Sequence, residues 1–305
     1  MDLLSDAILV MRTGRPHSAR TERRPPWAVS HPPFPGAGVH VMLQGTCVLT
    51  VADGDPVTVG PGDVVLLPHG DAHALGDASS GPPPGGPSVT PLTGLDDQPP
   101  ADGPVVMLCG AYLLDVARRH PLLGELPAVV HLPARHGRHP SLHAAVDLLA
   151  TELERPHPGS DALRAALLDA LLIYAIRAWY EQQSDHHHST TGWGAALRDP
   201  ALQPALNAIH TDPGRAWTVQ DLGAKAGLSR TTFSRRFTAT LGQPPMAYLT
   251  WWRMTLAARL LRDSDAPLSA VAQRIGYTSE FAFANAFKRE FGVAPGRYRK
   301  QCQET

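Results

Sequence analysis

The last third of the chain contains one pattern twice. Leu222–Tyr248 aligns with Val271–Tyr298 at the glycine that follows a short apolar stretch, and one residue is then inserted. An internal repeat of this kind indicates that the same supersecondary unit is built twice. No other feature of the 305 residues restricts the fold as strongly. The aligned pairs are Gly227 with Gly276, Phe233 with Phe283, Phe237 with Phe287, Leu241 with Phe291, Gly242 with Gly292, Pro245 with Pro295 and Tyr248 with Tyr298.

Each copy predicts a helix-turn-helix. In the first copy a short helix over 219–226 is expected to end at Gly227, because glycine adopts the left-handed conformation that a tight connection needs. Ser229 then supplies an N-cap for a second helix, which buries apolar side chains four residues apart and ends at Gly242. The second copy repeats these features with a helix over 268–275, Gly276, Ser279 and Gly292.

A long helix is expected between the two units, over 245–262. A rigid connecting helix would fix the separation of the two reading helices. They could then enter successive major grooves on one face of DNA, roughly 34 Å apart. The prediction depends on apolar residues that recur at spacings of three and four, namely Leu249, Trp252, Leu256 and Leu260.

The charge of the chain is divided between its two parts. The whole chain has a formal net charge of −1, which by itself does not suggest a nucleic-acid partner. From Asp212 to Thr305, however, fourteen Lys and Arg residues outnumber seven Asp and Glu residues, a net charge of +7, and the remainder carries −8. A basic region joined to an acidic one predicts a polyanionic partner for the C-terminal part.

The remaining signals of composition favour a cytoplasmic protein. Three widely spaced cysteines, Cys47, Cys109 and Cys302, do not imply a disulfide framework. The first ten residues are too short and too acidic for a secretory signal. No run of about eighteen apolar residues predicts a membrane helix. We therefore expect a reducing cytoplasmic location and no membrane partner.

The C-terminal part resembles the DNA-binding domain of the AraC/XylS family of transcription regulators. The resemblance covers about a third of the chain and implies an all-α domain that binds double-stranded promoter or operator DNA. By the habit of the family, activation is the expected sign of regulation, with RNA polymerase as a further partner. The matching motifs are Leu228-Ser229-Arg230, Phe233-x3-Phe237, Leu241-Gly242-x2-Pro245-x2-Tyr248, Arg253-x3-Ala257-x2-Leu260-Leu261, Ala272-x3-Gly276-Tyr277, Phe283-x3-Phe287-Lys288-Arg289-x-Phe291-Gly292 and Pro295-x2-Tyr298-Arg299.

Burial of Phe233 and Phe237 predicts which face of the first reading helix meets DNA. Arg235 lies on the opposite face and is the best candidate for a bidentate contact to guanine. Arg230 and Arg236 are expected to contact phosphates. The candidate DNA-binding residues of this helix are Arg230, Thr231, Ser234, Arg235 and Thr238.

The matching face of the second reading helix is less polar. Phe281 and Ala284 offer little hydrogen-bonding capacity, so this helix is expected to contribute affinity and contact with thymine methyl groups more than base choice. Asn285 is a candidate reader of adenine, and Lys288 and Arg289 suit phosphates. We therefore expect the first unit to carry most of the base reading and the second to act as an anchor.

The N-terminal part predicts a β-sandwich or barrel. Short runs rich in Val, Leu and Thr over 39–51, 57–67 and 105–114 are separated by Gly, Pro and Asp turns. Residues 62–73 have the spacing G-x5-P-x-G-x2-H, which resembles the second motif of the cupins. In that motif the histidine, here His73, points into the barrel. The resemblance implies a cupin-like sensor domain that binds a small effector, as in a subgroup of AraC-type regulators.

The first cupin motif departs from the pattern of metal-binding cupins. Those proteins carry an H-x-H pair and a glutamate, whereas this chain offers His40 alone and no glutamate before Asp53. An enzymatic metal site is therefore not expected. The alternatives are a reduced site for a zinc or copper ion, an apolar effector pocket, and a redox role for Cys109. The candidate effector or metal residues are His40, His69, His73 and Cys109.

Two helices are expected after the barrel, over Ser141–Glu154 and from Ser160 or Asp161 to about Gln182. The second is so apolar that it needs two neighbours. Either the sensor provides both, or one neighbour is its own copy in a second subunit. At the other end of the chain, five arginines between Arg12 and Arg24 predict either an arm over the pocket or a disordered segment.

Together these patterns predict an α+β protein. We expect a cupin-like β-barrel at 1–135 with a disordered loop at 76–103, a helical dimerisation segment at 138–182, a linker at 183–194 and an all-α double helix-turn-helix domain at 195–305. The expected function is that of a sequence-specific, effector-responsive regulator of transcription that acts as a homodimer and is not an enzyme. The alternative is a cupin metalloenzyme, a dioxygenase or an isomerase, with an accessory DNA-binding domain.

Overall fold

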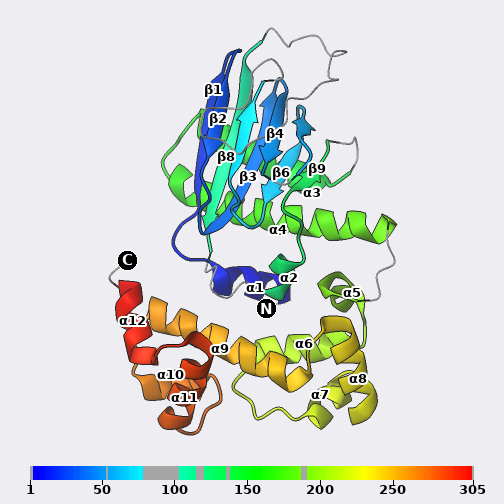
Figure 1. Ribbon diagram of the computed structural model, residues 1–305, viewed down its shortest axis with the longest axis vertical. Coiled ribbons are helices and arrows are strands. Elements are labelled where there is room, and N and C mark those ends of the chain that lie inside the picture. The colour runs from blue at the N-terminus through cyan, green and yellow to red at the C-terminus, as the bar shows by residue number, and fades with distance from the viewer. Residues whose placement is uncertain are drawn as a thin grey trace. The chain divides into compact units, whose positions relative to one another are not determined.

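The computed structural model (Figure 1) contains two compact units, which we call the barrel unit and the helical unit. The described residues are 3–52, 54–77, 103–114, 120–134, 138–186 and 191–303. Most of the expected loop at 76–103 and part of the expected linker at 183–194 lie outside them. The barrel unit consists of Arg12–Arg119 and Leu126–His187, and the helical unit of Met1–Met11, His120–Glu125 and His188–Thr305.

The barrel unit contains two antiparallel sheets, which confirms the expected β-architecture. One sheet has the strand order β1-β8-β3-β6-β9 and the other β2-β7-β4-β5. Apolar side chains from both sheets, among them Met42, Leu49, Leu75 and Met107, form one buried core. The strands are β1 (His17–Arg23), β2 (Ala28–His31), β3 (Gly36–Gln44), β4 (Cys47–Val51), β5 (Val57–Val59), β6 (Val64–Leu67), β7 (His73–Gly76), β8 (Val105–Leu113) and β9 (Val130–Leu132).

The arginine-rich N-terminal segment forms strand β1, so both expectations for it were wrong. It is an edge strand that pairs with β8 from His17 opposite Ala111 to Arg23 opposite Val105. Its side chains are mostly exposed, so the strand is held in place by backbone pairing with β8 rather than by burial. Charged residues are also what an exposed edge needs to discourage further pairing. The sequence therefore lacks the apolar alternation by which a strand is usually predicted.

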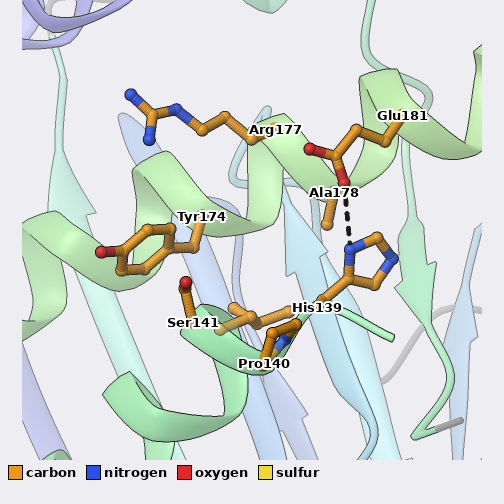
Figure 2. A pocket seen from close by; sticks show the side chains of 8 residues that line it. His139, Pro140, Ser141, Tyr174, Arg177, Ala178 and Glu181 are labelled. Atoms are coloured by element: carbon orange, nitrogen blue, oxygen red, sulfur yellow. Dashed lines mark ion pairs between the residues drawn. The ribbon is translucent and has the colours of Figure 1, made fainter. Parts of the chain in front are cut away.

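Two helices cover the barrel, α3 (Pro140–Glu154) and α4 (Ser160–His186). They pack on each other, and α4 also contacts β1 and β9 (Figure 1). Figure 2 shows a pocket at the start of α3, where His139 forms a 3.3 Å ion pair with Glu181 of α4. This pair holds the beginning of α3 against α4. The expected helices are thus confirmed, with the barrel as one neighbour of α4. Contact with a second subunit stays a prediction.

The helical unit contains both expected helix-turn-helix units. Gly227 and Gly276 have the left-handed conformation, with φ of 64° and 84°. The side chains of Ser229 and Ser279 accept hydrogen bonds from the backbone of Thr232 and Ala282. The helices are α1 (Leu3–Met11), α2 (Pro121–Gly124), α5 (Trp193–Arg198), α6 (Leu202–Thr211), α7 (Val219–Lys225), α8 (Arg230–Leu241), α9 (Pro245–Asp263), α10 (Leu268–Arg274), α11 (Glu280–Phe291) and α12 (Pro295–Gln303).

Two segments from the N-terminal part of the sequence belong to the helical unit. Helix α1 contacts α6 and α9, and its buried residues include Leu4, Ile8 and Met11. Helix α2 contacts α5 and buries Leu122 and Leu123. The domain boundaries expected from the sequence had placed both segments with the sensor. Among the described residues, no helix is long and apolar enough to cross a membrane.

A buried polar cluster joins these segments to α6 and α9. Nε2 of His210 lies 2.6 Å from the hydroxyl of Tyr248, and that hydroxyl lies 3.5 Å from Nε2 of His120. Nδ1 of His120 accepts a hydrogen bond from the backbone of Leu122. A neutral His120 therefore carries its proton on Nε2. Burial, and then the neighbouring His210, lowers the pKa of His120 well below its usual range.

Acidification is therefore expected to destabilise the helical unit. The pKa of His120 is lower in the folded chain than in the unfolded one, so the folded state loses stability as the pH falls below about 6.5. The loss for one such group is at most about 1.4 kcal/mol per pH unit. Melting temperatures at pH 7.5 and 5.5 measure it. The melting temperature of His120→Asn should fall less between these pH values than that of the parent. The control His17→Asn, on the exposed edge strand, should show the same fall as the parent. Equal drops in all three proteins would contradict the prediction.

Candidate nucleic-acid interface and histidine cluster

Helix α8 presents the expected face to solvent. Its aromatic residues Phe233 and Phe237 are fully buried, and they lie against α9 through contact of Phe237 with Tyr248. Of the five predicted contact residues, Arg230, Thr231 and Arg235 are exposed, and Ser234 and Thr238 are half-buried. Thr231, Arg235 and Thr238 lie opposite the two phenylalanines, and Ser234 lies on the flank. Arg230 begins the helix three residues before Phe233, so it lies on the side of Phe233 rather than on the opposite face.

Arg236 has a partner within the helical unit. Its guanidinium donates two hydrogen bonds to the carboxylate of Asp199, at 2.7 and 2.9 Å. Asp199 precedes α6, and its carboxylate also accepts hydrogen bonds from the backbone of Ala201 and Leu202. Arg236 is thus part of the packing between α8 and the start of α6. The guanidinium that was expected to contact phosphate is thus paired within the chain, and the phosphate contact stays a prediction.

Helix α11 presents the equivalent face of the second unit. Phe283 and Phe287 are fully buried, whereas the side chain of Phe281 is 77% exposed. Asn285, Lys288 and Arg289 are exposed, and Ala284 is half-buried. An aromatic side chain that is left so exposed on a reading helix suits contact with the apolar surface of bases. The five predicted residues lie on one side of the helix.

One helix connects the two reading helices. At its N-terminal end α9 buries Tyr248 and Trp252, and toward its C-terminal end it buries Met254 and Leu261 with α10 and α11. Figure 1 shows α9 running from the α7–α8 pair to the α10–α11 pair. Since both ends are buried, α9 holds the two exposed faces as parts of one unit.

A second candidate site lies inside the barrel, where three histidines meet. His40 comes from β3 in the five-stranded sheet, and His31 and His73 come from β2 and β7 in the other. The pairing of β2 with β7 places His31 opposite His73, and their rings stack 4.7 Å apart. Nε2 of His40 lies 2.8 Å from Nε2 of His73. One ring nitrogen of each residue lies within 4.8 Å of the others.

The outer ring nitrogens of two of these histidines have their own partners. Nδ1 of His73 donates to the backbone oxygen of Asp71 at 2.9 Å, which leaves Nε2 with its lone pair. Nδ1 of His40 lies 3.2 Å from the thiol sulfur of Cys109, its neighbour across the β3–β8 pair. The expected residue Cys109 is therefore behind His40 rather than beside the meeting point of the rings.

The sequence prediction of this site needs two corrections. His69 is not part of the cluster, because its Nε2 bonds the backbone oxygen of Leu126 at 2.9 Å. His31 belongs to the cluster and was missed. It ends a strand of four residues bounded by Pro26 and Pro32, and such a short run between prolines does not suggest a strand. The useful signal would have been a strand pairing, which one sequence does not reveal.

Burial sets the protonation of the cluster. It lowers the pKa of His31, lowers that of His40 well below its usual range and lowers that of His73 to about 4. The imidazoles are therefore neutral near pH 7, which is the form that binds metal ions. Burial raises the pKa of Cys109, so its resting form is the thiol. A thiol is less reactive than the thiolate on which the redox role depends.

Three neutral nitrogen donors suit a particular class of cation. Zinc and copper ions prefer imidazole, and a set of three histidines leaves one position of a tetrahedral zinc ion open. Magnesium and calcium ions prefer oxygen ligands, and the cluster contains no carboxylate among the described residues. The donor set thus fits the zinc or copper ion that was one of the expectations.

Two family models match successive parts of the chain, and several relatives match most of its length. The family model described as Cupin matches residues 2–181, and the model described as Helix-turn-helix domain matches residues 222–301. An AraC-like transcription regulator of Streptomyces antibioticus is 34% identical over 98% of this chain and 99% of its own. The HTH-type transcriptional regulator AlkR of Acinetobacter baylyi is 30% identical over 86% of this chain and 87% of its own. The RCS-specific HTH-type transcriptional activator RclR of Escherichia coli is 30% identical, over 87% and 84%.

Proposed function

Because the chain belongs to the AraC family of transcription regulators, we propose that it reads promoter DNA with the exposed faces of α8 and α11. The observation that supports this most directly is the pair of exposed helix faces connected by α9, which is buried at both ends. In this proposal Arg235 reads guanine, Asn285 reads adenine and Phe281 contacts thymine methyl groups. The relatives are named as regulators, which supports a non-enzymatic role over that of a cupin metalloenzyme.

Selection from random DNA tests the reading of a specific sequence. The full chain is incubated with a random duplex library, and bound DNA is amplified over several rounds. We expect enrichment of two short blocks about one helical turn apart, with stronger base preference in the block bound by α8. A library that stays random after these rounds would contradict the proposal.

The signal is proposed to enter at the histidine cluster of the barrel. In this proposal His31, His40 and His73 bind one late transition-metal ion, and Cys109 and the backbone of Asp71 hold two of the rings in position. Ligating histidines in proteins usually donate their second ring nitrogen in this way. The bound ion would supply positive charge and an open coordination position inside the barrel.

Metal content tests this site. The full chain, with His186, His187 and His188 replaced by alanine to remove a run of adjacent histidines, is stripped with a chelator and reloaded with zinc. After gel filtration we expect one zinc ion per chain by elemental analysis. His40→Ala and His73→Ala should retain almost none, because each removes a ligand nitrogen. His69→Ala is the matched control and should retain it. Zinc that persists without His40 and His73, or is absent from the parent, contradicts the site.

Cys109 has a different expected effect. Cys109 is a partner of His40 and not a ligand in this proposal. Its replacement by serine should therefore weaken zinc affinity by about 10- to 100-fold without abolishing binding. Cobalt can replace zinc as a spectroscopic probe. The cobalt-loaded chain should show no thiolate-to-cobalt charge-transfer band. Such a band would place the sulfur on the metal and contradict this arrangement.

We also propose that the chain forms a homodimer through α3 and α4. Their outer surface retains apolar side chains, with Leu148 57% and Leu163 51% exposed. A second copy of the same helices would cover them. Sedimentation of the parent and of a Leu148→Glu, Leu163→Glu variant tests the dimer, which the variant should lose.

Activation through contact with RNA polymerase remains part of the proposal and follows the habit of the family.

A further inference from the structure

Helix α1 and the segment His120–Glu125 are built into the core of the helical unit. In α1 the side chains of Leu3, Leu4 and Ile8 are buried, and in the second segment His120 and Leu122 are fully buried. The two segments also touch each other, because the backbone N–H of His120 donates to the sulfur of Met11 at 2.9 Å. One segment that precedes the barrel unit in the sequence and one that interrupts it thus complete a unit whose other residues all follow His187.

Both segments converge on the first turns of α9. The hydroxyl of Tyr248 lies between Nε2 of His210 and Nε2 of His120, at 2.6 and 3.5 Å. The carboxylate of Asp6, in α1, lies 3.5 Å from Nδ1 of His210. The ring of His120 packs edge-on against Trp193 and Trp251, with centroids 4.8 and 5.1 Å apart. One tyrosine of α9 is therefore held from two sides by residues outside the helix-turn-helix units.

The same contacts reach the end of the first reading helix. The carboxylate of Glu125 accepts a hydrogen bond from the backbone of Trp193 at 2.8 Å. The preceding residue, Gly192, donates to the backbone oxygen of Thr240 in α8 at 2.7 Å. Tyr248 also packs on Phe237 of α8, with ring centroids 6.0 Å apart. These contacts surround the turn between α8 and α9, where the direction of α9 relative to α8 is set.

In the second unit the equivalent tyrosine is Tyr298, whose ring packs on Phe287 and Phe291 of α11. Tyr248 differs in its position, because it lies where the first reading helix leads into α9. The contacts of Asp6, His120 and His210 thus occur at the junction where a small rotation would move α11 relative to α8.

We propose that α1 and His120–Glu125 form a clamp that sets the spacing between the two reading helices. The positioning residues of the clamp are Asp6, His120 and His210, and they act through Tyr248. The inference rests on the proposed function in that α8 and α11 must both contact one DNA site. It adds that the N-terminal segment determines which separation of the two DNA blocks the protein prefers.

The experiment compares affinities for DNA duplexes with altered spacing. The two blocks enriched by selection are synthesised at their native separation and with one base pair added or removed. Tyr248→Phe removes the bridging hydroxyl and keeps the ring. The same substitution at Tyr174, in α4 of the barrel unit, is its control. Loss of the buried hydrogen bonds is expected to reduce the preference of Tyr248→Phe for native over altered spacing by about two- to ten-fold. The base preference within each block should not change, and Tyr174→Phe should behave as the parent.

A role in stability alone predicts a different result. Such a role would lower the fraction of active protein and weaken binding to every duplex equally. The variant would then keep the spacing preference of the parent, and this result would overturn the inference. Ile8→Ala, which removes an α1 contact without a polar group, is measured in parallel and should shift the preference in the same direction. If selection enriches two blocks but spacing is unaffected, the clamp is wrong. If no DNA is enriched, the proposed function itself is wrong.

Discussion

Replacement of Gly276 by alanine is expected to destabilise the helical unit by about 2–5 kcal/mol. The residue has φ of 84°, and a side chain in the left-handed region costs about 1–2 kcal/mol. A Cβ atom would also lie 2.4 Å from the backbone oxygen of Gly214, in the loop between α6 and α7. Backbone cannot move aside as a flexible side chain does, so crowding adds about 1–3 kcal/mol. Denaturant unfolding of the full chain, followed by helical circular dichroism, measures the change.

The repeat supplies the control for this prediction. Gly227 has the equivalent position and φ of 64°, but no atom lies within 4 Å of the place where its Cβ would be. Gly227→Ala should therefore cost only the conformational strain, about 1–2 kcal/mol. Equal losses of stability in the two variants would show that crowding against the backbone of Gly214 does not add to the cost of a side chain at Gly276.

Replacement of Arg235 by alanine is expected to have the largest effect on DNA recognition. A bidentate contact to guanine contributes about 1–3 kcal/mol of discrimination, which corresponds to a loss of about 5- to 150-fold in affinity for the selected site. The preference for guanine at one position should disappear as well. Fluorescence anisotropy with the selected duplex and with duplexes substituted at each position measures both effects.

Two other variants distinguish this role from general charge. Lys288→Ala should weaken binding to all sequences alike and lower the slope of affinity against salt by about one unit, because it removes a phosphate contact. Arg236→Ala should reduce stability and leave base preference intact, because its guanidinium is paired with Asp199. If Arg236→Ala changed base preference as Arg235→Ala is expected to, the assignment of the reading face would be incorrect.

The helix-turn-helix units could be predicted in detail because their signals are local. Gly227, Ser229 and Gly242 specify a turn, a cap and a helix end within sixteen residues, and the spacing of Phe233 and Phe237 specifies the buried face. The repeat confirms each of these assignments with a second example. The contact between Arg236 and Asp199 could not be predicted in this way, because the two residues are 37 positions apart and Asp199 lies between α5 and α6.

The histidine cluster could be predicted only in part. His73 belongs to a motif with defined spacing, and His40 lies on a strand with a clear apolar pattern. His31 reaches the cluster through the pairing of β2 with β7, a contact between residues 42 positions apart that no local pattern specifies. The same holds for α1. This helix was not expected, and no local pattern specifies the unit against which it packs.

The discontinuous sequence of the helical unit affects how the protein is made. Met1–Met11 leaves the ribosome before the barrel unit, and its partners in α6 and α9 are synthesised about two hundred residues later. Domains generally fold as units in the order of synthesis. Here the barrel unit can fold before the helices against which α1 packs have been synthesised. A recombinant fragment that begins at His188 would lack part of its own core, so the usual practice of expressing such a domain alone would remove the residues that complete it.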